Sequence, residues 1–166
     1  MKHLEPGTRI AGCAIPVFSL RSKGSFGVGD FGDLKLMITW AAQTGQKILQ
    51  ILPINDTTSS GTWVDSYPYS AISIYALHPM YADLRQLPAL KDGEATARFQ
   101  ALQAELNALP QIDYEAVNKA KREYLLLVFK QEFAKVKRTK AYKTFLQEPD
   151  FWLPGYADYC IRRDAR

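Results

Sequence analysis

The sequence predicts an α/β fold in which a strand–helix–strand unit near the N-terminus is followed by a mostly helical segment. Two mostly apolar runs, residues 11–18 and 47–52, are typical of buried strands. Between them, apolar residues recur at the i, i+3, i+4, i+7 spacing of an α-helix, at Leu34, Met37, Ile38 and Ala41. The composition then changes from Gly, Pro, Ser and aromatic residues to Ala, Leu, Glu, Lys and Gln. We therefore divide the chain into residues 1–88 and residues 89–166.

The strand–helix–strand unit has clear boundary signals. Asp30 can cap the N-terminus of the helix with its carboxylate, and Gly45 suits the C-terminal cap. Pro16 is expected late in the first strand, because proline cannot donate to a strand ladder. A unit of this length predicts two parallel strands joined by a right-handed crossover.

The second segment predicts a series of helices, over residues 99–109, 113–133 and 141–146 and from residue 154 onward. Pro110 ends the first of them, and Asp113 suits the N-cap of the second. The third is expected to end near Pro149, and Pro154 suits the first turn of the last.

The composition excludes several classes of protein. Of the 166 residues, 47% are hydrophobic and 12% aromatic, which excludes a disordered chain. No apolar run approaches the roughly 20 residues of a membrane span, and the N-terminus lacks the apolar segment of a signal peptide. Cys13 and Cys160 lack the spacing of a metal site or a disulfide framework, and predict buried thiols in a reducing, cytoplasmic compartment. No metal, cofactor or membrane partner is expected.

The formal net charge of +4 is concentrated in one stretch. Residues 115–143 hold nine Lys or Arg against three Glu, a local net charge of +6. We interpret this excess as the solvated face of a long helix. No signature of a DNA- or RNA-binding module accompanies it, so no nucleic-acid partner is expected.

A long irregular segment, residues 53–79, separates the two halves. Loops beyond about 12–15 residues are uncommon and often functional. This one carries aromatic rings, hydroxyls and a carboxylate, at Trp63, Asp65, Ser66, Tyr67, Tyr69, Ser70 and Tyr75. Such a set suits a polyhydroxylated ligand, whose C–H face packs on a ring while its hydroxyls need polar partners. The alternative is that the rings only anchor the loop to the body of the protein.

Residues 27–32 match the G-x-G-x-x-G pattern of dinucleotide-binding proteins, with Gly27, Gly29 and Gly32 after a strand and before a helix. Asp56 follows the next strand, where that fold places an acidic residue. Two features disfavour this interpretation. Residues 19–26 separate the strand from the first glycine, and Asp30 would place a negative charge at the helix end where a pyrophosphate binds.

Three ordered blocks of sequence closely resemble one enzyme family. They are RIAGCAIPVFSLRSKGSFGVGDFGD at 9–33, WAAQTGQKILQILPIN at 40–55 and DSYPYSAISIYALHPMYADL at 65–84. The segment FWLPGYA at 151–157 is similar to a W-L-x-x-Y-A element of the same family. The chain is thereby identified as a member of the 4-α-glucanotransferases, the amylomaltases or disproportionating enzymes of glycoside hydrolase family 77. The form DSYPYS…ALHP resembles the branch with starch-binding domains ahead of the catalytic domain.

The resemblance implies a (β/α)₈ TIM barrel, of which the two predicted strands would be the first. Residues 89–166 would then be a mostly helical insertion. Such barrels take about 250 residues and place their sites at the C-terminal face, so the chain is expected to be the N-terminal part of the catalytic domain. The family's retaining mechanism needs a nucleophile and an acid/base carboxylate. The resemblance places both beyond Arg166, so no catalytic residue is expected within the chain.

The resemblance also implies substrate-binding residues. The family's S-P-Y motif corresponds to Ser66, Pro68 and Tyr69, with Tyr67 inserted, and its Ser and Tyr contact glucose units near the cleavage point. His78 stands where the family usually has Asn before Pro, and we expect it to form local hydrogen bonds without a catalytic role.

The expected function is therefore that of an enzyme part. A glucanotransferase moves α-1,4-glucan segments between maltooligosaccharides, and this part would supply contacts to the glucan. Two alternatives remain open at this point: a dinucleotide-binding module built on the glycines of residues 27–32, and a non-catalytic carbohydrate-binding module.

Overall fold

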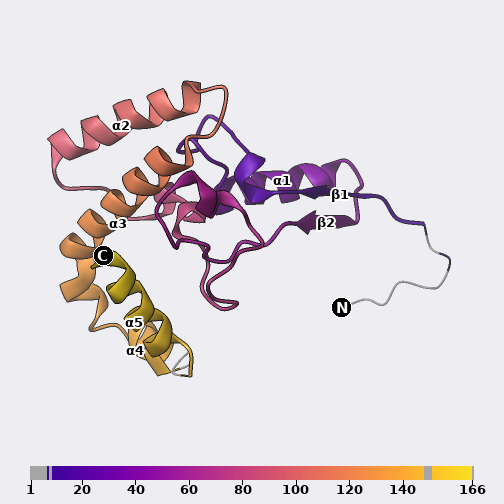
Figure 1. The fold of residues 1–166 in the computed structure, drawn as a ribbon. Coiled ribbons are helices and arrows are strands. Elements are labelled where there is room, and N and C mark those ends of the chain that lie inside the picture. Colours follow the sequence, from indigo (N-terminus) through magenta and orange to yellow (C-terminus); the bar gives the residue numbers. More distant parts are fainter. Residues whose placement is uncertain (1–6, 8, 148–150, 166) are drawn as a thin grey trace.

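The computed structural model describes residue 7 and residues 9–147 and 151–165. Within this part the fold is mixed α/β, as predicted, with two strands and five α-helices (Figure 1). The strand–helix–strand unit lies on one side of the molecule, and the helices of the second half on the other. Between them runs a long irregular segment containing short 3₁₀ turns. No helix of the described residues is both long and apolar enough to cross a membrane.

The first unit consists of β1 (Gly12–Ile15), α1 (Phe31–Gln43) and β2 (Ile48–Ile51). The strands are parallel, and their register pairs Gly12 with Ile48 and Ile15 with Ile51. The parallel pairing confirms the predicted order of elements. Pro16 lies one residue after β1, not within it, because it starts a 3₁₀ turn at Val17–Ser19.

The prediction that both strands are buried is wrong. Side chains alternate along each strand between a half-buried and an exposed position. Cys13, Ile15, Leu49 and Ile51 form the half-buried face, whereas Ile48 on the other face is 48% exposed. The apolar runs in the sequence therefore belong to a sheet of which the described residues cover only one face.

The start of α1 is closed by a capping box. The carboxylate of Asp30 accepts hydrogen bonds from the backbone N–H groups of Gly32 (2.9 Å) and Asp33 (3.2 Å). In return, the backbone N–H of Asp30 donates to the Asp33 carboxylate at 3.1 Å. The predicted cap is confirmed, and Gly45 follows the helix with a positive φ of 76°, as suits the C-terminal cap predicted for it.

The glycines of residues 27–32 serve packing and not a dinucleotide. A Cβ atom at Gly27 would lie 2.8 Å from side-chain atoms of both Leu106 and Val117. At the helix start, the Asp30 carboxylate already occupies the N–H groups that a pyrophosphate would need. The structure therefore gives the G-x-G-x-x-G match a structural explanation.

The second half contains α2 (Gly93–Ala108), α3 (Tyr114–Val136), α4 (Lys140–Gln147) and α5 (Leu153–Asp164). The four predicted helices are confirmed. Asp113 caps α3 by accepting from the N–H of Ala116 at 2.9 Å, and Pro154 lies in the first turn of α5. The predicted end of α4 near Pro149 lies outside the described residues.

The main core joins the two halves. Its buried residues come from the glycine-rich segment, from a 3₁₀ turn at Leu84–Gln86 and from α2 and α3: Phe26, Val28, Leu84, Phe99, Leu106, Val117 and Ala120. A second cluster, Val17, Met80 and Tyr81, lies beneath α1 residues Phe31 and Leu34. The helical segment is thus packed on the loops that follow β1 and β2.

One basic residue of α3 departs from the prediction of a solvated face. Lys121 is 1% exposed, and its Nζ donates to the carbonyl oxygens of Met80 (2.6 Å) and Ala82 (2.9 Å). The same Nζ lies 3.6 Å from the carboxylate of Asp30. A lysine this deep needs such partners, because burial of an unpaired charge is costly. Lys121 therefore ties α3 to the start of α1 and to the end of the long loop.

Candidate functional site

The long loop after β2 is closed at its base by backbone hydrogen bonds. The N–H of Asp56 donates to the carbonyl of Ala76 at 2.9 Å, and the N–H of Ile72 donates to the carbonyl of Asp56 at 2.8 Å. Two residues nearer to each end of the loop, the N–H of His78 donates to the carbonyl of Ile54 at 3.0 Å. The segment predicted to be irregular is therefore an ordered loop with its two ends side by side.

Inside this loop, the buried carboxylate of Asp65 organises a tight turn. It accepts hydrogen bonds from the Ser59 hydroxyl (2.9 Å), from the Ser60 N–H (3.0 Å) and from the Gly61 N–H (2.7 Å). Burial alone would raise the pKa of Asp65, but these donors outweigh it and lower the pKa below its usual value. Asp65 is therefore a charged acceptor that holds residues 59–61 in place.

The outer surface of the loop presents aromatic rings to solvent. Trp63 is 68% exposed, Tyr67 59% and Tyr69 61%. The rings of Tyr67 and Tyr69 lie 5.5 Å apart at an angle of 51°. The backbone N–H of Trp63 donates to the carboxylate of Glu115 on α3 at 2.9 Å, which attaches the turn to the helical half. These rings are therefore open to solvent on a loop whose turn is attached to α3.

The three predicted substrate-binding residues lie together at this surface. Ser66 is the last residue of a 3₁₀ turn at Trp63–Ser66, directly after the buried Asp65. Ser66 and Pro68 are half-buried, and Tyr69 is exposed beside Tyr67. The inserted Tyr67 thus adds a second ring next to the predicted one. Tyr75, the last aromatic of the loop, instead stacks on Trp152 at 5.5 Å, so this ring does anchor the loop.

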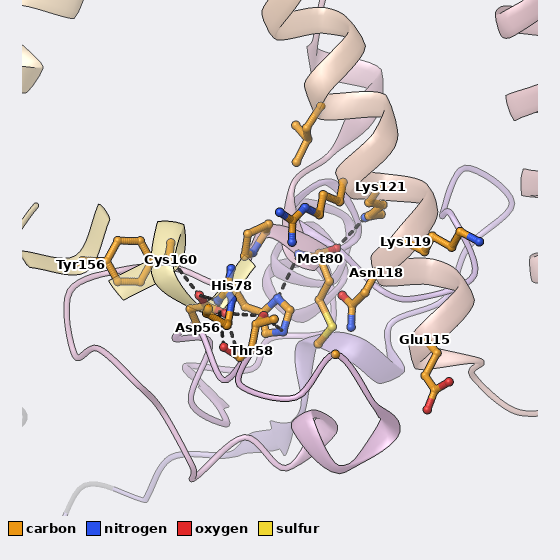
Figure 2. A pocket seen from close by; sticks show the side chains of 15 residues that line it. Asp56, Thr58, His78, Met80, Glu115, Asn118, Lys119, Lys121, Tyr156 and Cys160 are labelled. Atoms are coloured by element: carbon orange, nitrogen blue, oxygen red, sulfur yellow. Dashed lines mark hydrogen bonds and ion pairs between the residues drawn. The ribbon is translucent and has the colours of Figure 1, made fainter. Parts of the chain in front are cut away.

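A cleft of about 460 Å³ is enclosed by α3, α5 and residues of the long loop (Figure 2). Glu115, Asn118 and Lys119 of α3 line one side and Tyr156 and Cys160 of α5 the other. Asp56, Thr58, His78 and Met80 lie between these two sides. Ser66, Pro68 and Tyr69 do not line this cleft, so it is separate from the predicted substrate contacts.

His78 forms the local hydrogen bond that was predicted for it. Its Nδ1 accepts from the backbone N–H of Met80 at 3.1 Å, capping the 3₁₀ turn at Pro79–Tyr81. An accepting Nδ1 places the proton of the neutral ring on Nε2, which faces the Thr58 hydroxyl at 3.5 Å. Burial lowers the pKa of His78, although the nearby charge of Asp56 opposes this. The imidazole is therefore a neutral, structural group.

Sequence reasoning missed the role of Asp56, which it considered only as the acidic residue of a dinucleotide-binding pattern. Its buried carboxylate accepts from the hydroxyl of Tyr156 on α5 at 2.6 Å, and from the N–H (2.9 Å) and hydroxyl (2.7 Å) of Thr58. Arg163 of α5 lies 3.9 Å from the same carboxylate. The contact to Tyr156 spans 100 positions, so no local pattern could predict it.

The comparisons with known proteins agree with the resemblance. The sequence profile of glycoside hydrolase family 77, described as 4-alpha-glucanotransferase, matches residues 15–166. The chain belongs to the 4-alpha-glucanotransferase family. It is 42% identical over 156 residues to the 4-alpha-glucanotransferase DPE2 of Oryza sativa subsp. japonica, covering 94% of this chain and 16% of the relative. The 4-alpha-glucanotransferase of Chlamydia caviae is 38% identical over 148 residues, which cover 87% of this chain and 27% of that protein.

The same partial coverage recurs in a third family member. The 4-alpha-glucanotransferase of Chlamydia trachomatis is 40% identical over 130 residues, which are 78% of this chain and 23% of the relative. The chain thus spans between about one sixth and about one quarter of the length of these glucanotransferases.

Proposed function

We propose that this chain is the first part of a glucanotransferase catalytic domain and that the outer surface of its long loop binds α-1,4-glucan. In this proposal, residues 1–88 start a (β/α)₈ barrel with β1 and β2 as its first strands. Residues 89–166 form a helical insertion packed beside it. The loop after β2 then belongs to the C-terminal face of the barrel, where such folds place their ligands.

One observation carries the glucan proposal: the adjacent rings of Tyr67 and Tyr69 are exposed on a loop whose base and turn are held by hydrogen bonds. A pyranose offers apolar C–H groups that pack on such rings. The hydroxyls of Ser66 and Tyr69 are of the kind that a glucose unit needs as hydrogen-bond partners. A loop that is ordered before binding also loses less conformational entropy when the sugar arrives.

The catalytic carboxylates of the retaining mechanism lie, in this proposal, in sequence that follows Arg166. The buried carboxylates of the described residues support this. Asp30 and Asp33 form the capping box of α1, and Asp56 and Asp65 hold the loop. A retaining pair needs two carboxyl groups about 5–5.5 Å apart on either side of the scissile bond, whereas these four are occupied by structural hydrogen bonds.

A fluorescence titration of the 166-residue chain with maltoheptaose tests the glucan proposal. Trp63 lies close to the predicted contacts in sequence and is exposed, so its emission should change on binding. Cellohexaose, which has the same sugar in β-1,4 linkage, is the matched control, and NAD tests the dinucleotide alternative. We expect saturable binding of maltoheptaose alone. Equal response to both glucans, or a response only to NAD, would overturn the proposal.

A further inference from the structure

The Asp56 cluster, which consists of Asp56, Thr58, Tyr156 and Arg163, connects α5 to the base of the glucan-facing loop. Asp56 is 1% exposed and sits where the two ends of the loop meet. One carboxylate oxygen accepts from the N–H and hydroxyl of Thr58, and the other accepts from Tyr156. The carboxylate therefore uses both oxygens to join the loop to the helix.

Arg163 supplies the balancing charge and a second connection. Its guanidinium lies 3.9 Å from the Asp56 carboxylate and donates to the carbonyl of Thr58 at 2.8 Å. The side chain is itself held by Asp164, which accepts from its Nε at 2.9 Å. Asp164 also pairs with Arg122, so the end of α5 is attached to α3. The helix that contacts the loop is thus itself connected to α3.

The connection continues from Thr58 to the residues that face the glucan. The next residues along the chain, Ser59 to Gly61, donate to the Asp65 carboxylate, and Ser66 follows Asp65 directly. A series of polar contacts, centred on the buried carboxylates of Asp56 and Asp65, therefore runs from α5 to the start of the S-Y-P-Y segment. A change at the helix should alter the loop without removing any group that touches the sugar.

We infer that Tyr156 and Arg163 are positioning residues that hold the long loop in the conformation that binds glucan. This inference rests on the proposed function for its ligand. It assigns α5, at the opposite end of the sequence, a role in glucan affinity. Tyr156 suits this role because burial, together with its bond to Asp56, raises the pKa of its hydroxyl, which stays a donor at any ordinary pH.

The test is Tyr156→Phe in the 166-residue chain, which removes one hydroxyl and keeps the ring that lies 6.0 Å from Trp152. Tyr159→Phe, on the same helix and partly exposed, is the matched control. Amide hydrogen exchange reports the order of residues 57–66, with α2 as an internal reference. Maltoheptaose titration reports the affinity, and thermal unfolding reports overall stability.

We expect Tyr156→Phe to speed exchange in residues 57–66 by at least about tenfold, the lower end of the effect expected for one hydrogen bond to a carboxylate. Exchange in α2 should not change, and maltoheptaose binding should weaken several-fold. Arg163→Met should act in the same direction and Arg163→Lys should restore part of the affinity, whereas Tyr159→Phe should leave all three measurements unchanged.

Unchanged exchange in residues 57–66 for both Tyr156→Phe and Arg163→Met overturns the inference. Faster exchange with an unaltered affinity for maltoheptaose also overturns the inference, because the contacts would then stabilise the loop without affecting binding. These outcomes require that the unsubstituted chain binds maltoheptaose. If the unsubstituted chain does not bind maltoheptaose, the glucan proposal fails and the positioning role fails with it. If the unsubstituted chain binds and the variants bind equally well, only the positioning role fails.

Discussion

The carboxylate of Asp30 lies 3.6 Å from the ammonium group of Lys121, and this buried pair joins the N-terminus of α1 to the middle of α3. Burial raises the pKa of Asp30 and lowers that of Lys121, while the attraction between the two groups opposes both shifts. The carboxylate is also reached by Arg85 at 3.0 Å. The position of the helical half against the first βαβ unit therefore depends on buried charges as well as on apolar packing.

Lys121→Met should destabilise the chain by about 3 kcal/mol, the lower end of the range for removing one partner of a buried ion pair. The lower end applies because Asp30 keeps Arg85 as a partner. The substitution also leaves the carbonyls of Met80 and Ala82 without their donor. Urea unfolding measures the change. Lys119→Met, two residues earlier and exposed, is the control and should alter the midpoint little.

His78 should make the chain less stable as the pH falls below about 6.5, the ordinary pKa of histidine. Burial holds the pKa of His78 lower in the folded state, so the unfolded chain takes up the proton first. Stability is then lost as the pH falls from the unfolded toward the folded pKa. The free energy of unfolding, measured at intervals between about pH 5 and 8, gives the slope against pH. For one group this slope is at most about 1.4 kcal/mol per pH unit.

The only other histidine of the sequence, His3, supplies the control. His78→Gln should remove the slope near neutral pH, since the glutamine does not titrate and its amide oxygen can accept from the N–H of Met80. His3→Gln should retain the slope. A slope that persists in His78→Gln would assign the pH dependence to another group.

The isolated chain should self-associate. Large apolar side chains are exposed on α1 and β2, at Leu36, Ile38, Trp40 and Ile48, and within the described residues each strand has one unpaired edge. Exposed strand edges and apolar patches favour association between copies. Light scattering after gel filtration should give a mass that rises with concentration.

The double substitution Ile38→Lys and Ile48→Lys should shift the chain toward the monomer. Thr39→Lys with Gln50→Lys adds the same charge at neighbouring exposed positions and should have a smaller effect. A monomer at all concentrations in the unsubstituted chain would show that the exposed residues have no role in association.

The local elements of this fold could be predicted because each is specified by nearby residues. The cap at Asp30 needs only the two amides that follow it, and Pro154 suits a first turn by its own geometry. The irregular loop could also be located, because aromatic, Gly, Ser and Thr residues follow one another there without a helix or strand period.

The polar core could not be predicted, because its contacts join distant positions. In the sequence, Lys121 is one of several cations on a basic helix. Its burial follows from the folded contacts with Asp30 and Met80, which lie far from it in sequence. Asp56 and Tyr156 are likewise 100 positions apart. The exposed sides of β1 and β2 were also missed, because an apolar run does not show whether another layer covers it.

The 166-residue chain alone should release no glucose from maltotriose. Its buried carboxylates are held by backbone and hydroxyl donors in caps and turns, so a retaining pair is not assembled among the described residues. A coupled glucose assay, with a mock purification as control, measures this. Turnover above that control would place the catalytic pair within this segment.

Tyr69 provides the sharpest test of the proposed contact between the loop and glucan. Its ring is 61% exposed beside Tyr67, in the segment that corresponds to the family's S-P-Y motif. Tyr69→Phe removes only the hydroxyl and should weaken maltoheptaose binding by roughly two- to tenfold, the effect of one neutral hydrogen bond of about 0.5–1.5 kcal/mol. Tyr69→Ala also removes the ring on which the pyranose is proposed to pack and should weaken binding further.

Tyr67→Phe is the matched control, since the inserted residue has a similar exposure but no counterpart in the motif. It should cost less affinity than Tyr69→Phe. Thermal unfolding of each variant separates binding from anchoring. If the Tyr69 ring only anchors the loop, Tyr69→Ala should lower the melting temperature. Tyr69→Phe should then leave the dissociation constant for maltoheptaose unaltered. That result would move Tyr69 from the binding surface to the scaffold, and Ser66, which is assigned through the same motif, would lose most of its support.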